Sequence, residues 1–180
     1  MDYIDRMIAG DFDTEIAGIL EEKAAYEAAY AKKIPVFLAG GIWNYEDVLR
    51  AKALGVDGVQ VATRFVTTEE CDASLAYKMA YVNATANDVT IIKSPVGLPG
   101  RALNNQMIRS LKGGNQKITR CYHCIKNCKP AEIPYCITNA LINAVNGNID
   151  EGLIFCGANV DRITKIETVH DVVTDLMFVN

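Results

Sequence analysis

The sequence predicts an α/β protein in which short buried strands alternate with helices along the first half of the chain. Three features indicate this class: two short apolar runs that end in small residues, a helical segment after each run, and short connections between them. The chain has 180 residues, of which 50% are hydrophobic and 22% are charged, so it is long enough to bury a core. We therefore expect a single domain over residues 1–180.

The first predicted helix spans residues 15–33, which are rich in Ala, Glu and Lys. Its tyrosines Tyr26 and Tyr30 lie at helical spacing, and we interpret both as packing residues. The run 34–39 that follows is apolar and is closed by Gly40-Gly41. This pattern is typical of a strand buried on both faces of a parallel sheet.

A second helix is predicted after Asn44, which is a favourable N-cap residue with Asp47 three positions further on as its capping partner. This helix should stop at Gly55. Residues 58–63 form the second predicted strand, and a helix over residues 69–84 follows it.

After about residue 88 the alternation of strand and helix becomes less regular. We expect a strand over residues 89–94 and helices over residues 99–111 and 134–146, the last of them ending at Gly147. A terminal helix should begin at Asp161 or Thr164 and reach Phe178.

The composition excludes a membrane-spanning chain. The longest nearly apolar stretch, residues 34–43, has about half the length that a transmembrane helix needs. Asp2 and Asp5 stand where a signal peptide would carry basic residues. We therefore expect a cytoplasmic protein with no membrane partner.

Charge is distributed unevenly along the chain. The formal net charge is −4 and the pI is about 5.2, yet residues 93–129 carry eight Lys or Arg and no Asp or Glu. The acidic total and the lack of interleaved aromatic residues argue against a nucleic-acid partner. A phosphate-bearing cofactor, an acyl carrier or plain solvent remain open as partners of this basic segment.

The ends of the two predicted strands are candidates for a ligand site, because parallel α/β proteins bind ligands at the carboxyl ends of their strands. The glycine pair at residues 40–41 lets a backbone approach an anion closely, and a helix N-terminus follows it. At the second strand end, Thr63 adds a hydroxyl group. These features together predict a phosphate site, whereas the glycine pair alone would indicate only a tight turn.

The stretches PVFLAGGIWNYEDVLRAKALGVDGVQVATRFVTTEECDAS and KSPVGLPGRALNN closely resemble the end of the flavin barrel in the nitronate monooxygenase family, which includes enoyl-acyl-carrier-protein reductase II. The resemblance covers roughly residues 30–160. It implies a (β/α)8 TIM barrel that binds FMN. The implied phosphate-binding residues are Gly40 and Gly41 after the seventh strand, and Gln60, Val61, Ala62 and Thr63 after the eighth. The family usually has glycine at the position of Ala62.

A complete barrel needs about 250 residues, so the resemblance implies only the last two βα units in residues 1–88, followed by a helical, cysteine-bearing extension over residues 89–180. The family's catalytic histidine has no counterpart, since His123 and His170 lie in other contexts. We therefore expect the carboxy-terminal half of an enzyme, with no catalytic residue in this chain. Its open strand edges would pair with the missing amino-terminal half or with a second copy of the chain.

The resemblance implies an FMN-dependent oxidoreductase that acts on a small-molecule substrate. The first alternative is oxidative denitrification of alkyl nitronates, and the second is an enoyl reductase that draws electrons from NAD(P)H. A third alternative is a catalytically inactive half-barrel with a structural metal site.

The cysteines form a second candidate site. The four residues Cys121, Cys124, Cys128 and Cys136 have a spacing that lets four thiolates converge on zinc or on an iron–sulfur cluster, and His123 is a substitute ligand for zinc. Reduced cysteines that pack a loop are the alternative. The isolated Cys71 and Cys156 are interpreted as small buried hydrophobic residues.

Overall fold

The structure of the chain is a computed structural model that describes residues 12–126 and 128–177. It divides into two compact units. The first runs up to Val61 and takes up the chain again from Val173, and the second comprises Ala62–Val172. The units meet in sequence at residue 61 rather than at the expected change near residue 88. The expectation of one domain stays a prediction.

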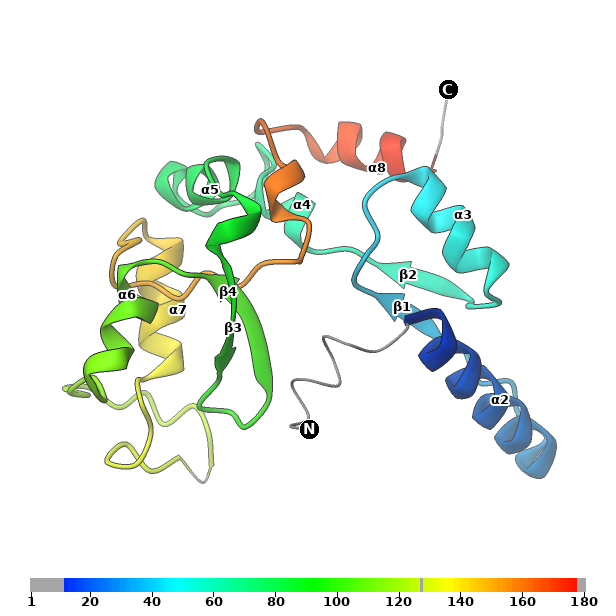
Figure 1. Ribbon diagram of the computed structural model, residues 1–180, viewed down its shortest axis with the longest axis horizontal. Coiled ribbons are helices and arrows are strands. Elements are labelled where there is room, and N and C mark those ends of the chain that lie inside the picture. The colour runs from blue at the N-terminus through cyan, green and yellow to red at the C-terminus, as the bar shows by residue number, and fades with distance from the viewer. Residues whose placement is uncertain (1–11, 127, 178–180) are drawn as a thin grey trace. The chain divides into compact units, whose positions relative to one another are not determined.

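The first unit alternates helices and strands as predicted. It contains α2 (Phe12–Tyr30), β1 (Phe37–Ala39), α3 (Tyr45–Ala53) and β2 (Gly58–Gln60). The two strands lie side by side and run parallel, with Phe37 opposite Gly58 and Ala39 opposite Gln60 (Figure 1). The α/β class and the parallel pairing of the two strands are confirmed.

Burial in the first unit differs from the prediction. Phe37 in β1 is 65% exposed, so the strand is not buried on both faces; within the described residues β2 is its only neighbouring strand. Tyr26 and Tyr30 are also exposed, and their rings stack on each other with centroids 6.0 Å apart. The interpretation of these tyrosines as packing residues was wrong, because α2 buries Ile16 and leaves its other described apolar side chains partly or largely open.

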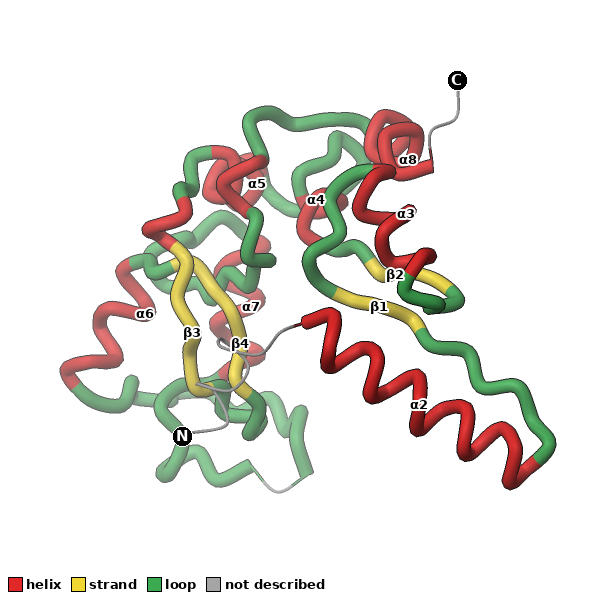
Figure 2. The backbone as a smooth tube through the Cα atoms, turned by 45° about the vertical axis from the view of Figure 1, so that its right-hand side comes forward, coloured by secondary structure: helices red, strands yellow, loops and turns green. Residues whose placement is uncertain are grey.

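The second unit is built around an antiparallel hairpin. Strand β3 (Val89–Lys93) pairs with β4 (Pro99–Leu103), and the hairpin runs beside α6 (Gln106–Ser110) and α7 (Ile137–Val145) (Figure 2). The remaining elements of this unit are α4 (Thr63–Val66), α5 (Leu75–Val82) and the short 3₁₀ turns η1 (Ala86–Asp88), η2 (Leu111–Gly113) and η3 (Val160–Arg162). Helix α8 (Val169–Met177) closes the described chain and crosses from the second unit to the first.

The expected helix over residues 99–111 was wrong in its first half, where the chain forms β4. Pairing with β3 holds this segment as a strand, and Gly100 leaves room for a neighbouring ring: a Cβ at this position would lie 2.4 Å from Cε1 of Phe155. The absence of a side chain lets Phe155 cover the hairpin. The extension is therefore a mixture of strands and helices, and not the helical segment that was predicted.

Capping residues and glycines near the predicted helix ends mark where several helices start or stop, whereas the predicted helix lengths are less accurate. The helix expected over residues 69–84 is confined to α5, which begins after Ser74 because the Ser74 hydroxyl accepts a hydrogen bond from Tyr77 N. Gly55 and Gly147 follow α3 and α7 with φ of 96° and 95°, as expected of helix stops. Phe178, the expected end of the last helix, lies outside the described residues. None of the described helices is long and apolar enough to cross a bilayer.

The core of the second unit joins the hairpin to α6 and α7. Its buried members are Ile92, Ala102, Met107, Ile108, Tyr135, Ala140 and Leu153. Tyr135 is fully buried, and burial raises its pKa to about 12. Within the described chain its hydroxyl has no hydrogen-bond partner. An unpaired hydroxyl in such a core costs free energy without returning any.

Replacing Tyr135 by phenylalanine is therefore expected to raise the free energy of unfolding, by about 1 kcal/mol. The ring would keep its packing, and only the desolvated hydroxyl would be lost. Urea denaturation followed by circular dichroism measures the change. The control is Tyr81→Phe, because Tyr81 is also buried but its hydroxyl donates to the Phe155 carbonyl oxygen at 2.7 Å. That variant should be less stable than the wild type, and the prediction for Tyr135 fails if both variants lose stability.

Candidate functional site

The carboxyl ends of β1 and β2 meet at one edge of the first unit. Ala39 is in register with Gln60, so Gly40-Gly41 and Val61 leave the sheet from neighbouring positions. Gly40 and Gly41 have φ of 92° and 71°, a left-handed conformation that other residues adopt only with strain. Both glycines are exposed, and a Cβ at Gly40 would meet nothing within 4 Å. The turn therefore offers an accessible backbone at the strand end.

Arg50 is a residue of this edge that the sequence analysis missed. Its Nη2 atom would lie 3.8 Å from a Cβ placed on Gly41. Its Nη1 atom is 3.3 Å from Oδ1 of Asp13, in an ion pair that is about half exposed. The guanidinium therefore adjoins the glycine turn and carries a positive charge there. Its position depends on how α3 leaves the turn, which is not visible in the sequence.

The N-terminus of α3 is capped by its own side chains, and its role at an anion site stays a prediction. Asn44 Oδ1 accepts from Asp47 N at 3.2 Å, while Asp47 Oδ2 accepts from Asn44 N and, at 2.8 Å, from Trp43 N. This capping box satisfies the amide of Asp47 in the first turn of the helix, and Glu46 adds another negative charge to that turn. The predicted cap is confirmed, and the acidic residues of the first turn make the glycines and Arg50 the more favourable candidates for binding an anion at this edge.

Ala62 and Thr63 belong to the second unit, and their role at a phosphate site stays a prediction. Ala62 has φ of −128°, which lies outside the left-handed region that favours glycine. The hydroxyl oxygen of Thr63 accepts a hydrogen bond from Gly157 N at 2.9 Å. This bond fixes the start of α4 to a segment far along the chain.

The four clustered cysteines come together in the second unit. They lie in the long connection between η2 and α7, residues 114–136, whose described part has no helix or strand. All four line one cavity of about 240 Å³, and His123 also contributes to its wall. Burial raises the pKa of the Cys128 thiol, and the neighbouring Cys121, Cys124 and Cys136 raise it further. The four cysteines therefore line one cavity, and the convergence of their sulfur atoms on one centre stays a prediction.

The grouping of the cysteines is loose. All six cysteines of the chain are free thiols. In the part of the chain that is described, no three His, Cys, Asp or Glu side chains are placed so that they could hold a metal ion. A metal centre thus stays a prediction. Cys71 and Cys156 lie apart from this group and are half-buried, and burial raises the pKa of Cys156 to about 11.

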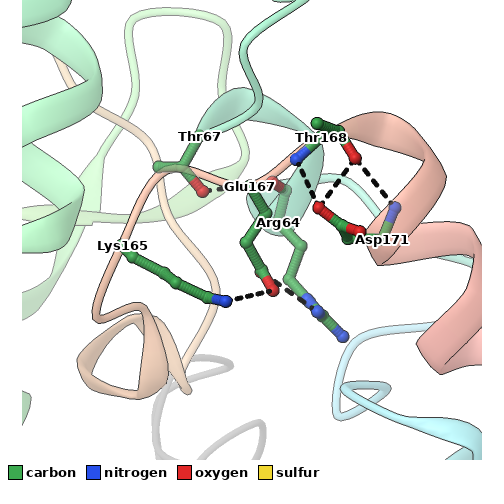
Figure 3. A network of polar contacts seen from close by, with 6 residues as sticks. All are labelled: Arg64, Thr67, Lys165, Glu167, Thr168 and Asp171. Carbon is green, nitrogen blue, oxygen red and sulfur yellow. Dashed lines mark hydrogen bonds and ion pairs between the residues drawn. The ribbon is translucent and has the colours of Figure 1, made fainter.

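A buried ion pair stabilises the segment after Thr63. Arg64 is 5% exposed, and its Nη2 atom lies 3.1 Å from Oε2 of Glu167, which Lys165 also approaches at 3.9 Å (Figure 3). Glu167 also exchanges backbone hydrogen bonds with Thr67 and Glu69. Beside it, Thr168 donates to the carboxylate of Asp171, and these hydrogen bonds lower the pKa of Asp171.

Comparison with known proteins places this geometry in a family. The family model described as nitronate monooxygenase matches residues 11–178. The chain belongs to the nitronate monooxygenase family. This family is flavin-dependent, and its members are enzymes.

Relatives and solved structures agree with this family. The chain is 30% identical over 112 residues to a probable nitronate monooxygenase of Staphylococcus haemolyticus. The aligned stretch covers 62% of this chain and 28% of that protein. The chain is also 37% identical over 78 residues to a probable nitronate monooxygenase of Staphylococcus aureus strain Newman. That aligned stretch covers 43% of this chain and 22% of that protein. The chain therefore spans only a minor part of the length of these relatives.

Among solved structures, FabK from Thermotoga maritima aligns with a TM-score of 0.63 and 26% identity, over 84% of this chain and 46% of that chain. The enoyl reductase domain of MlnA from Bacillus amyloliquefaciens aligns with a TM-score of 0.69 over 94% of this chain and 53% of that domain. Its identity of 14% shows likeness of fold alone. These solved structures thus share the α/β fold of the chain.

Proposed function

We propose that this chain forms the FMN phosphate-binding part of a flavin-dependent oxidoreductase that oxidises alkyl nitronates. The observation that carries the proposal is the edge formed by β1 and β2, where two left-handed glycines and Val61 leave neighbouring parallel strands. Parallel α/β folds bind phosphate-bearing cofactors at such edges. The nitronate alternative rests on the family and on the curated relatives of that name.

The residues at this edge fit a phosphate ester. Gly40 and Gly41 carry no side chain that would keep an anion away from the backbone, and a Cβ at Gly40 would project into open space. The guanidinium of Arg50 supplies a positive charge and several donors for the phosphate oxygens. In this proposal the glycine backbone and Arg50 hold the phosphate, while Gln60 and Val61 form the neighbouring wall.

When bound, FMN supplies the electron-accepting ring on which the oxidation of the substrate depends. This chain contributes the anchor that positions the cofactor. We assign no acid–base role to its residues, because the histidine implied by the resemblance has no counterpart among His123 and His170.

The second candidate function is an enoyl reductase that uses NAD(P)H, which the likeness to FabK at 26% identity favours. The two candidates differ in what reduces the flavin. With FMN bound and oxygen excluded, bleaching of the flavin absorbance by an alkyl nitronate supports the first, whereas bleaching by NAD(P)H alone supports the second. A flavin that neither compound reduces contradicts catalysis by this chain and leaves only the proposed role in binding.

The phosphate anchor is tested by comparing FMN with riboflavin, which has the same ring system but no phosphate. We expect the chain to bind FMN about tenfold more tightly, which corresponds to ~1.4 kcal/mol from charge-assisted hydrogen bonds. Arg50→Gln should remove most of this preference and leave riboflavin binding unchanged. Quenching of flavin fluorescence on titration with protein gives both dissociation constants.

Lys52→Gln is the matched control, since Lys52 is an exposed cation on the same helix α3. It should keep the wild-type preference for FMN, because the proposal depends on the position of Arg50 and not on the net charge. Equal binding of FMN and riboflavin by the wild type, or equal losses in the two variants, would contradict the phosphate anchor.

A further inference from the structure

The connection between η2 and α7 has features that its packing role does not require. Long connections without secondary structure are uncommon in compact units and are often functional. This one, residues 114–136, is closed on itself by a hydrogen bond of 2.8 Å from Gln116 N to Pro134 O. The fully buried Tyr135 anchors its end in the core. Both ends are therefore fixed, while the middle presents its cysteines to one cavity.

The cavity is built around sulfur. Its wall contains the thiols of Cys121, Cys124, Cys128 and Cys136, and the rest of it is partly apolar, with Ile118, Ile125, Pro130 and Ile133. Apolar neighbours lower the local dielectric and so strengthen the interaction of a thiolate with a cation, even though Cys121 and Cys124 are exposed on one side. The two isolated cysteines of the chain, Cys71 and Cys156, do not line this cavity.

Two of the four sulfur atoms accept hydrogen bonds. The backbone N–H of His123 donates to the sulfur of Cys121 at 3.4 Å, and the hydroxyl of Thr138 donates to the sulfur of Cys124 at 2.9 Å. His123 has φ of 50°, an unfavourable conformation for a residue other than glycine, and it lies between these two cysteines in the chain. Hydrogen bonds of this kind orient ligand sulfur atoms and stabilise their negative charge.

The charge around the cavity suits a thiolate centre. Four thiolates with a divalent ion carry a net charge of −2, and Lys126 in the cavity wall offsets part of it. The same loop also contributes Arg120 and Lys129, of which Lys129 pairs with Glu132 at 3.1 Å. Cys136 is the N-cap of the nine-residue α7, and its side chain makes no capping hydrogen bond. The positive end of the helix dipole favours a negative charge at that sulfur.

We propose that Cys121, Cys124, Cys128 and Cys136 together ligate one thiophilic metal centre, either a single zinc ion or an iron–sulfur cluster. The two occupants require the same four thiolate ligands. Since no three of these side chains are yet placed to hold an ion, the loop closes on the metal as it binds. The proposal is independent of FMN, so its test is made on the whole chain without flavin.

The test has two arms. In one, the reduced chain is titrated with Zn²⁺, and bound zinc and free thiols are counted; in the other, it is reconstituted anaerobically with ferrous iron and sulfide, and absorbance from sulfur-to-iron charge transfer is recorded. We expect one centre per chain in one of the arms, with four of the six thiols protected from alkylation. The arm that succeeds identifies the occupant. Failure of both arms overturns the proposal.

Serine variants locate the ligands. Removing a group that only hydrogen-bonds to a metal ligand weakens metal sites by about 10- to 100-fold, so removing a ligand itself in Cys121→Ser or Cys124→Ser should weaken binding at least about 100-fold. Both residues are exposed, and circular dichroism should therefore show an intact fold. Thr138→Val should weaken binding about tenfold. Cys71→Ser is the control and should bind as the wild type does; equal losses in Cys71→Ser and in the two cavity variants would overturn the assignment.

Discussion

Replacing Glu167 by alanine is expected to lower the free energy of unfolding of the second unit by about 3 kcal/mol. The carboxylate of Glu167 is 3.1 Å from the guanidinium of Arg64, which is 5% exposed. Removing one partner of a buried pair leaves the other charge in a medium that solvates it poorly. The loss therefore exceeds what an ion pair at the surface would contribute. Thermal and urea denaturation of the variant measure it.

Lys165→Ala provides a matched control, because Lys165 approaches the same carboxylate at 3.9 Å but has a side chain that is 71% exposed. Its removal should change stability by less than about 1 kcal/mol, as is usual for exposed pairs. The loss of stability in Glu167→Gln should lie between those of Glu167→Ala and Lys165→Ala, since an amide oxygen still accepts a hydrogen bond but carries no charge. Equal effects of the alanine substitutions at positions 165 and 167 would mean that burial of Arg64 does not determine the energetics.

Local chemistry made several features of the first unit predictable. The Asn44–Asp47 capping box and the stop at Gly55 depend on residues a few positions apart, and both are confirmed. The parallel pairing of β1 and β2 followed from two apolar runs separated by a helix. The exposure of Phe37 was not predictable in this way, because the burial of a strand depends on its neighbours in space.

Features that depend on distant partners were missed. The ion pair of Arg64 and Glu167 joins residues 103 positions apart, and nothing near either residue indicates the other. Residues 99–111 were predicted as a helix, but their first part forms strand β4, which is favoured by its pairing with β3 and by Phe155 over Gly100. Tertiary packing overrides local preference in such segments.

The candidate sites divide in the same way. The spacing of the four cysteines predicted that they would lie together, and they line one cavity, because the loop that carries them is short enough to bring them close. The glycine turn was visible as Gly40-Gly41. The contribution of Arg50 was not, since it depends on the path of α3 beyond the turn.

Replacing Gly152 by alanine should destabilise the second unit by about 3 kcal/mol, as overpacking against rigid backbone does. A Cβ at this position would lie 2.5 Å from Cα and 2.6 Å from N of Ala144 in α7, atoms that cannot rotate away. The segment cannot retreat easily either, because Leu153 N donates to Ala140 O at 2.9 Å and the Asn105 amide donates to Gly152 O at 2.7 Å. Urea denaturation should show a lower midpoint.

Gly113→Ala separates this clash from the general effect of adding a methyl group. A Cβ at Gly113 would meet nothing within 4 Å, so the free energy of unfolding of this variant should differ from the wild type by no more than about 0.5 kcal/mol. If Gly152→Ala unfolds at the same urea concentration as Gly113→Ala, α7 must be able to move away from the 152–153 segment. In that case the close approach of Gly152 to Ala144 would not determine the position of α7. The hydrogen bonds from Leu153 and Asn105 would then be what holds residues 152–153 in place.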